Sequence, residues 1–171
     1  MNSVAMVETP LADDLAARIL VADDQVHVLD ALQLLLKNQG YSTEAVTDPR
    51  RVMQALASDQ FDLVLMDMNY ERDTTADTEG LELVSQIREK DKNLPVLVMT
   101  AWGSVEVAVE AMRRGASDFV QKPWENQQLL GKVQAQVERV HALRQAQHYQ
   151  EDELQQARDI KTSYSRSKSR R

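Results

Sequence analysis

Polar side chains stand at the ends of four short apolar runs in this sequence. Asp23 and Asp24 follow the first run, Asp67 ends the second, Thr100 ends the third, and Lys122 lies just past the fourth. Short apolar runs are typical of strands buried on both faces of a parallel sheet. Open α/β sheets bind ligands beyond the carboxyl ends of their strands, so we expect these five side chains to be neighbours at one edge.

The residue types in this group favour phosphoryl transfer. Three carboxylates repel one another unless one takes up a proton or a cation lies among them. The candidate ligands are hard oxygen donors without His or Cys, so the implied ion is Mg²⁺. Lys122 adds a positive charge and Thr100 a hydroxyl, both suited to an incoming phosphoryl oxygen. A carboxylate in such surroundings, here Asp67, is a nucleophile that would form a labile acyl phosphate.

The elements that must position these residues alternate between strand and helix. The predicted strands are residues 18–22, 41–46, 61–67, 95–99 and 118–120, and the predicted helices are residues 25–39, 48–57, 80–90, 104–115 and a long one from about 125. Five such repeats predict an α/β fold with right-handed connections and helices on both faces of a parallel sheet. We expect the flavodoxin-like strand order 2-1-3-4-5, which places the weakly alternating second strand at an edge.

Composition bounds the function further. The chain has 27 Asp and Glu against 20 Lys and Arg, so direct DNA binding by this chain is not expected. The absence of cysteine excludes disulfides and thiolate chemistry and suits the cytoplasm. Residues 1–17 lack a basic start and a continuous apolar run, so they predict a flexible leader rather than a signal peptide or membrane span.

The C-terminal third changes character along its length. Val133, Val137, Val140 and Leu143 continue a helical stripe that closes a domain at residues 18–143. Gln147 and Gln150 interrupt the stripe, so residues 144–160 form either a helical linker or weak coiled coil, or a helix that frays. Residues 161–171, in which Ser alternates with Lys and Arg, predict a disordered basic tail.

In combination these motifs resemble the receiver domain of bacterial two-component response regulators. The matching segments are Leu20-Val-Ala-Asp-Asp24, Leu65-Met-Asp67, Val98-Met-Thr-Ala101 and Asp118-Phe-Val-Gln-Lys-Pro123. Any one motif is weakly specific, but their occurrence in this order is strongly so. The segments at 99–104, 111–115 and 122–124 are most similar to receivers of σ54-dependent (enhancer-binding) transcription activators.

The resemblance implies roles for individual site residues. Asp67 would be the phosphoacceptor. Asp24, Asp67 and the backbone carbonyl of Asn69 would bind Mg²⁺, and Asp23 would support the metal through water. Thr100 and Lys122 would contact the phosphoryl group.

It also implies a switch and partners. Phe119 would be the aromatic whose rotamer follows Thr100, and the Lys122–Pro123 peptide would be cis. A sensor histidine kinase would donate the phosphoryl group. The chain would be a cytoplasmic signalling domain and not an enzyme, since it would at most catalyse its own phosphorylation and dephosphorylation. A homodimer through the fourth helix, fifth strand and fifth helix, or through the C-terminal helix, would pass the signal to a downstream output domain or protein.

Two departures from the family pattern leave alternatives open. The polar segment 69–79 predicts a loop that is longer than usual, and Asn69-Tyr70 replaces the usual Met-Pro after the acceptor. One alternative is therefore a receiver-shaped binding module that works without phosphorylation. Another is a flavin protein or enzyme with the same fold. The phosphate site of a flavodoxin-like protein needs Ser, Thr or Gly after the first strand, where this chain has Asp23 and Asp24. The chain is either a stand-alone receiver or a fragment of a larger regulator.

Overall fold

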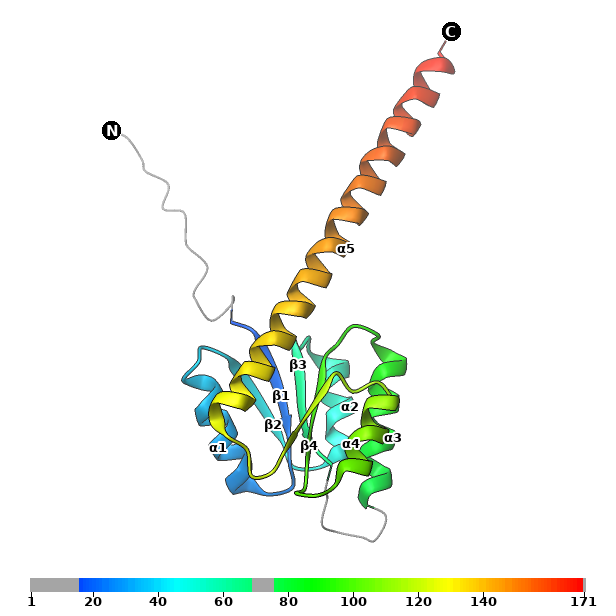
Figure 1. Ribbon diagram of the computed structural model, residues 1–171. Coiled ribbons are helices and arrows are strands. Elements are labelled where there is room, and N and C mark those ends of the chain that lie inside the picture. Colours follow the sequence, from blue (N-terminus) through cyan, green and yellow to red (C-terminus); the bar gives the residue numbers. More distant parts are fainter. Residues whose placement is uncertain (1–15, 69–75, 171) are drawn as a thin grey trace, which may run out of the picture.

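The computed structural model describes residues 16–68 and 76–170. In these ranges five strands alternate with five helices (Figure 1). The elements in chain order are β1 (Arg18–Ala22), α1 (Val26–Lys37), β2 (Ser42–Val46), α2 (Pro49–Ser58), β3 (Leu63–Asp67), α3 (Ala76–Lys90), β4 (Val96–Thr100), α4 (Val105–Arg113), β5 (Asp118–Gln121) and α5 (Asn126–Lys168). No helix in the described ranges has the length and apolar content needed to cross a bilayer.

The strands form one parallel sheet in the order β2-β1-β3-β4-β5, as the sequence predicts. Ala22 pairs with Met66 across β1 and β3, and Asp67 pairs with Met99 across β3 and β4. The three central strands therefore end at nearly the same level. This register brings the residues that follow β1, β3 and β4 to a common edge.

Two apolar layers enclose the sheet because alternate side chains of each strand point to opposite faces. Ile19 and Val21 of β1 pack with α1 and α5 on one face, whereas Leu20 and Ala22 pack with the layer of α2, α3 and α4. Figure 1 shows the same division of the helices. Strands β3 and β4 are buried throughout, and each large aliphatic side chain so buried contributes about 1.5–3 kcal/mol.

Local signals account for several helix ends. The Asp48 side chain accepts the backbone N–H of Arg50 at 2.9 Å, and Pro49 occupies the first turn of α2, as predicted. Gly40 follows α1 at φ +86°, a backbone conformation that L side chains rarely adopt. Ser104 precedes α4, but its side chain makes no capping hydrogen bond.

Helix α3 begins earlier than the sequence pattern predicts. The expected start was residue 80, whereas the helix begins at Ala76. Apolar periodicity starts only at Leu81, so it gave no signal for the polar first turn. The acidic residue Glu79 favours a helix N-terminus through the helix dipole. The rest of the predicted loop, residues 69–75, lies outside the described residues.

Helix α5 is longer than predicted. The sequence predicted a disordered tail from residue 161, whereas α5 continues to Lys168. Its first part packs on the sheet through a buried stripe that ends at Val140, and Leu143 is already 38% exposed. Beyond that point Figure 1 shows the helix projecting from the domain. Starting a helix is unfavourable, and the packed first half of α5 provides that start. No Gly or Pro follows Gly131 in the sequence, so no residue of low helix propensity of that kind ends the helix early. The predicted domain boundaries at residues 17, 143 and 160 stay predictions, and residues 1–15 lie outside the described ranges.

Candidate functional site

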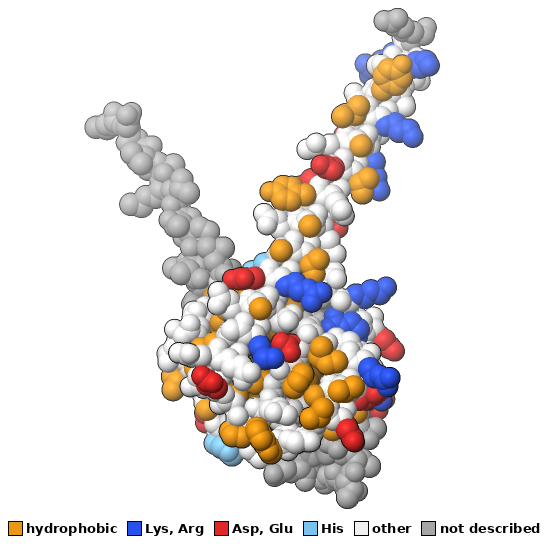
Figure 2. Space-filling view, viewed as in Figure 1, with side chains coloured by type: hydrophobic (Ala, Val, Ile, Leu, Met, Phe, Trp, Pro, Cys, Tyr) orange, Lys and Arg blue, Asp and Glu red, His pale blue; other side chains and the backbone are white. Residues whose placement is uncertain are grey.

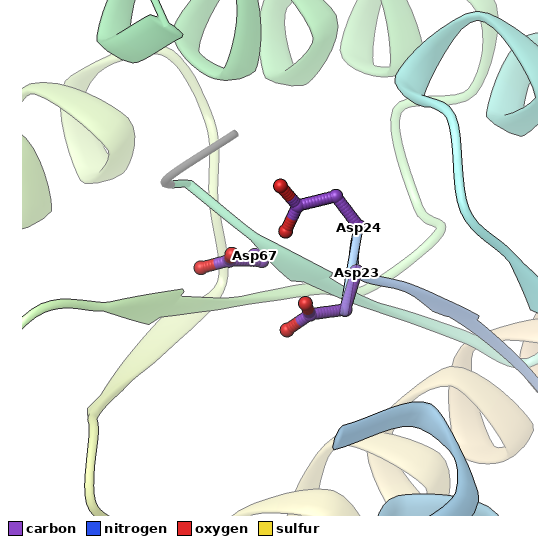
Figure 3. Close-up of side chains that lie close together, drawn as sticks. All are labelled: Asp23, Asp24 and Asp67. Atoms are coloured by element: carbon purple, nitrogen blue, oxygen red, sulfur yellow. The ribbon is translucent and has the colours of Figure 1, made fainter. Parts of the chain in front are cut away.

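Three carboxylates gather at the carboxyl edge of the sheet. Asp23 and Asp24 follow β1, and Asp67 is the last residue of β3. One oxygen from each carboxylate lies within 4.8 Å of the other two. Figure 3 shows the three side chains pointing to the same side of the strands. Asp23 and Asp67 are buried and Asp24 is half-buried, so two charges lie where water screens them poorly.

Lys122 joins this group from the segment after β5. Its Nζ atom lies 2.8 Å from Oδ2 of Asp23 and 3.3 Å from Oδ2 of Asp67. Burial by itself would lower the pKa of Lys122, but the hydrogen bond to Asp23 and the negative charge of Asp67 outweigh it and raise that pKa above its ordinary value. Lys122 is therefore a protonated counter-ion of two buried carboxylates.

The backbone around Asp23 explains why this carboxylate is so well fixed. Its own N–H donates to the carbonyl of Val46 at 3.2 Å, which ties it to the end of β2. Its Oδ1 atom accepts the backbone N–H of Gln25 at 2.9 Å, just before α1. This contribution of Gln25 was not predicted from the sequence. An aspartate that bonds the backbone two residues on is a known turn pattern, so the signal was present.

Thr100 closes β4 beside these groups. It is fully buried, and within the described part of the chain its hydroxyl oxygen has no hydrogen-bond partner. Its carbonyl accepts the backbone N–H of Lys122 at 2.8 Å, which holds the lysine segment against the end of β4. A buried hydroxyl without a partner costs about 1–3 kcal/mol. Such a group calls for an explanation, and a ligand oxygen is a chemically suitable partner.

The donor set fits Mg²⁺. All the candidate side-chain ligands are carboxylate oxygens, which Mg²⁺ prefers. In their ionised forms the three carboxylates and the Lys122 ammonium leave two negative charges, which a divalent cation would neutralise. The fourth predicted metal ligand, the carbonyl of Asn69, lies outside the described residues.

Phe119, the predicted switch residue, lies on β5, three residues before Lys122. It pairs with Val98 across β4 and β5 and is half-buried against the α2–α4 side of the core. Lys132 of α5 places its Nζ atom 5.4 Å from the ring centroid and 3.0 Å from Oδ1 of Asp118. The predicted rotamer change of Phe119 stays a prediction. The Lys122–Pro123 peptide is cis, as the resemblance implied.

A second polar cluster, which the sequence analysis also missed, fixes α5 at the opposite edge. Asp62 accepts the backbone N–H of Arg18 at 2.7 Å, and its carboxylate pairs with the guanidinium of Arg144. His141 lies 3.0 Å from the same carboxylate. Arg144 also donates to the carbonyl of Phe61 at 2.7 Å. These contacts hold α5 to β1 and β3 at the point where it leaves the domain.

The sequence of the chain matches a known protein family and several response regulators. A family model described as the response regulator receiver domain matches residues 19–134. Response regulator MprA of Mycolicibacterium vanbaalenii is 37% identical over 122 residues, which cover 71% of this chain and 51% of MprA. Response regulator protein FleR of Pseudomonas aeruginosa is 37% identical over 138 residues, which cover 81% of this chain and 27% of FleR. The chain thus spans about half of one relative and about a quarter of the other.

Solved structures agree with the sequence matches. NtrX from Brucella abortus superposes with a TM-score of 0.69 at 30% identity, covering 77% of this chain and 29% of NtrX. The N-terminal signal receiver domain of a two-component system response regulator from Bacteroides fragilis gives a TM-score of 0.64 at 35% identity, covering 71% of this chain and 97% of that domain.

Proposed function

Because the chain belongs to the response regulator receiver domain family, we propose that Asp67 accepts a phosphoryl group from a sensor histidine kinase in a Mg²⁺-dependent reaction. The observation that carries the proposal is the shared contact of Lys122 with Asp23 and Asp67 at the edge where three carboxylates meet. A structural ion pair needs only one acid. Two buried acids, a third acid beside them and a buried hydroxyl without a partner among the described residues form a site suited to a phosphoryl group and a divalent cation.

The chemical step is a displacement at phosphorus. A carboxylate oxygen of Asp67 attacks, the phosphorus–nitrogen bond of the donor phosphohistidine breaks, and the imidazole leaves with the bonding electron pair. The product is an acyl phosphate on Asp67. Bound Mg²⁺, held by Asp24, Asp67 and the Asn69 carbonyl with Asp23 acting through water, would neutralise charge on the transferring oxygens.

Thr100 and Lys122 act on the phosphoryl oxygens. The Thr100 hydroxyl, which has no partner among the described residues, donates a hydrogen bond to one oxygen. The Lys122 ammonium, already 3.3 Å from Asp67, forms an ion pair with another. Both donors lie on backbone that is hydrogen-bonded within the sheet edge, so they need little reorganisation.

The switch follows from a change of partners. A phosphoryl group on Asp67 competes with Asp23 for Lys122 and draws the Thr100 hydroxyl toward it. The segment between β4 and α4 then shifts, and Phe119 turns inward. This is a population shift between two packings of one fold.

The output surface is apolar and exposed. Val105, Val109 and Met112 lie on one exposed side of α4 and Trp102 just before it, each at least 40% exposed. Along α5, the exposed large apolar residues beyond the domain are Tyr149, Leu154, Ile160 and Tyr164. A phosphorylation-dependent homodimer would cover either the α4–β5–α5 face or the α5 helix. The chain spans only part of its relatives, and a downstream output domain or protein in the cytoplasm would receive the signal.

The experiment compares Asp67→Asn with the parent chain under a small-molecule phosphodonor and Mg²⁺. Intact mass spectrometry should detect one phosphoryl group on the parent and none on the variant. Asp30→Asn, which changes an exposed acid on α1, is the matched control and should be modified like the parent. Modification that persists in Asp67→Asn contradicts the assignment.

The Mg²⁺ requirement is measured separately. Mg²⁺ and the phosphodonor are titrated, and the fluorescence of Trp102, which follows β4, and Trp124, which follows β5, is recorded. The fluorescence should change in the parent and not in Asp67→Asn. A binding module that works without phosphorylation would keep its partner in Asp67→Ala and ignore the donor. A flavin protein would be yellow.

A further inference from the structure

A basic pocket lies at the edge of the sheet opposite the carboxylates. It has a volume of about 270 Å³ and is lined by the end of α3, the residues before β4, the α4–β5 connection and one side of α5. Pro95 and Ser117, which precede β4 and β5, lie in its wall. The pocket is therefore at the amino ends of the strands, whereas Asp67 is at a carboxyl end. Figure 2 shows Lys and Arg side chains gathered on this side of the domain, beside the base of the projecting helix.

The charge of the pocket is one-sided. Its charged lining residues are Arg88, Lys92 and Arg139, and no acid of the described ranges lines it. Within the described residues none of these three cations forms an ion pair with a carboxylate. Asp91, which is next to Lys92 in the chain, directs its carboxylate to the backbone N–H groups of residues 93 and 94. Unpaired cations converging from two helices are unusual in a chain with a net charge of −7.

Arg88 is the fixed cation of the pocket. Its guanidinium donates to the carbonyl of Gly115 at 2.6 and 3.0 Å and to the carbonyls of Asp91 and Lys92 at 3.2 and 2.8 Å. These bonds hold the group in place, and no carboxylate of the described residues forms an ion pair with it. Burial lowers the pKa of Arg88, the negative charge of Asp91 opposes this shift, and the charge of Arg139 lowers the pKa further, so the two cations lie close enough to repel. An anion between them would relieve that repulsion.

Neutral donors complete the lining. The Ser117 oxygen accepts the backbone N–H of Val96 at 3.1 Å, which leaves its hydroxyl proton to donate. The side-chain oxygen of Gln136 is buried, and no described residue donates to it. A half-turn of that amide would present N–H groups instead. The side chain of Asn93 adds a second amide.

We propose that this pocket binds a small phosphate-bearing anion through Arg88, Lys92 and Arg139. A phosphate group carries up to two charges and three outward acceptor oxygens, which match three cations and several neutral donors better than a single carboxylate does. The guanidinium fork of Arg139 suits phosphate geometry. Arg88 donates four hydrogen bonds to backbone carbonyls, so it contributes its charge and one remaining N–H group. The anion would bridge α3 and α5 where α5 leaves the domain. This site is separate from the phosphorylation site and does not depend on it.

The test uses the full chain without Mg²⁺ or phosphodonor, titrated with inorganic pyrophosphate, inorganic phosphate and citrate at about 0.15 M salt, where weak surface attraction is screened. Calorimetry gives the affinity, and amide chemical shifts locate the ligand. Pyrophosphate should bind one to one and shift the amides of residues 115–117. Lys92→Gln and Arg139→Gln should each weaken binding about tenfold. Lys161→Gln, an exposed lysine on α5 outside the pocket, should bind like the parent.

Four outcomes would overturn the proposal, three in the variants and chemical shifts and one in the citrate titration. The first is an affinity unchanged in both pocket variants. The second is equal weakening in Lys161→Gln, which indicates general charge attraction. The third is a set of shifts confined to residues 100 and 122, which places the anion at the phosphorylation site.

If phosphate binds as tightly as pyrophosphate, the ligand is the free ion, and tighter pyrophosphate binding favours a phosphorylated metabolite. Citrate binding as tight as pyrophosphate contradicts the preference for phosphate. Arg88 is left unchanged because its loss would remove four backbone hydrogen bonds.

Discussion

Lys122→Met tests whether one ammonium holds the carboxylate site together. In the parent chain Lys122 contacts Asp23, which is fully buried, and Asp67, which is 2% exposed. Methionine keeps much of the side-chain volume and removes the charge. The two carboxylates would then repel one another where little water reaches them. We expect a less stable chain at neutral pH in the absence of a divalent cation.

The magnitude follows from the burial of the partners. Removing one member of a buried ion pair costs about 3–5 kcal/mol because the other charge is left buried. The Lys122 side chain keeps 22% exposure, so the lower end, about 3 kcal/mol, applies here. That loss lowers Tm by roughly 10 °C for a domain of this size. Asp23→Asn should couple to Lys122→Met, so the double variant should recover about 1 kcal/mol or more of the summed losses.

The assay is urea unfolding of each variant with EDTA and again with excess Mg²⁺. Mg²⁺ should stabilise Lys122→Met more than the parent, because it replaces the missing positive charge. Lys132→Met is the matched control. Lys132 is 25% exposed but pairs with a single acid, Asp118, that is 31% exposed, so its loss should cost about 0.5 kcal/mol.

Two results would refute this reasoning. If Lys122→Met unfolds within the error of Lys132→Met in EDTA, Lys122 does not neutralise the buried acids. If the losses of Asp23→Asn and Lys122→Met simply add, the 2.8 Å contact carries no measurable coupling.

Three further predictions follow from the same geometry. The pKa of Lys122 is raised in the folded chain, so the stabilisation from its ion pairs is complete below the unfolded lysine pKa of about 10.4. This stabilisation is lost as pH rises through the higher folded pKa. In urea titrations at alkaline pH, the difference in unfolding free energy between the parent and Lys122→Met should therefore narrow as pH passes the folded pKa. Thr100→Val should leave stability unchanged or raise it by up to about 1 kcal/mol, because it removes a buried hydroxyl without a partner among the described residues, while it slows phosphorylation in a mass-spectrometric time course. Finally, Leu154→Glu combined with Ile160→Glu should abolish self-association of the phosphorylated chain in sedimentation experiments if α5 forms the dimer, whereas Gln156→Glu should not.

Much of the fold was predictable because its signals are local. Each central strand is a run of apolar residues long enough to cross the sheet, and Gly40 and Asp48 mark helix ends through their own backbone and side-chain chemistry. The strand order followed from the single weakly apolar strand, β2, which had to lie at an edge. The extra turn of α3 and the length of α5 were missed because polar helical turns have no apolar period.

The site was predictable in composition but not in geometry. Chain order alone indicated that Asp23, Asp67 and Lys122 follow parallel strands and so share an edge. Lys122 contacts both buried acids, and one of them, Asp23, is 99 residues away in the chain. These contacts depend on the register of the strands and on the backbone hydrogen bond from Lys122 to Thr100.

The sequence by itself determined which elements form and which side chains end them, since burial and capping are read within a few neighbouring residues. Only the tertiary structure decided which charges are paired. It joined Lys122 to two carboxylates and placed Arg88, Lys92 and Arg139 around a pocket that no acid of the described residues lines. The physical reason is that Coulomb energy depends on distance and burial, and both are set by packing between elements far apart in the chain.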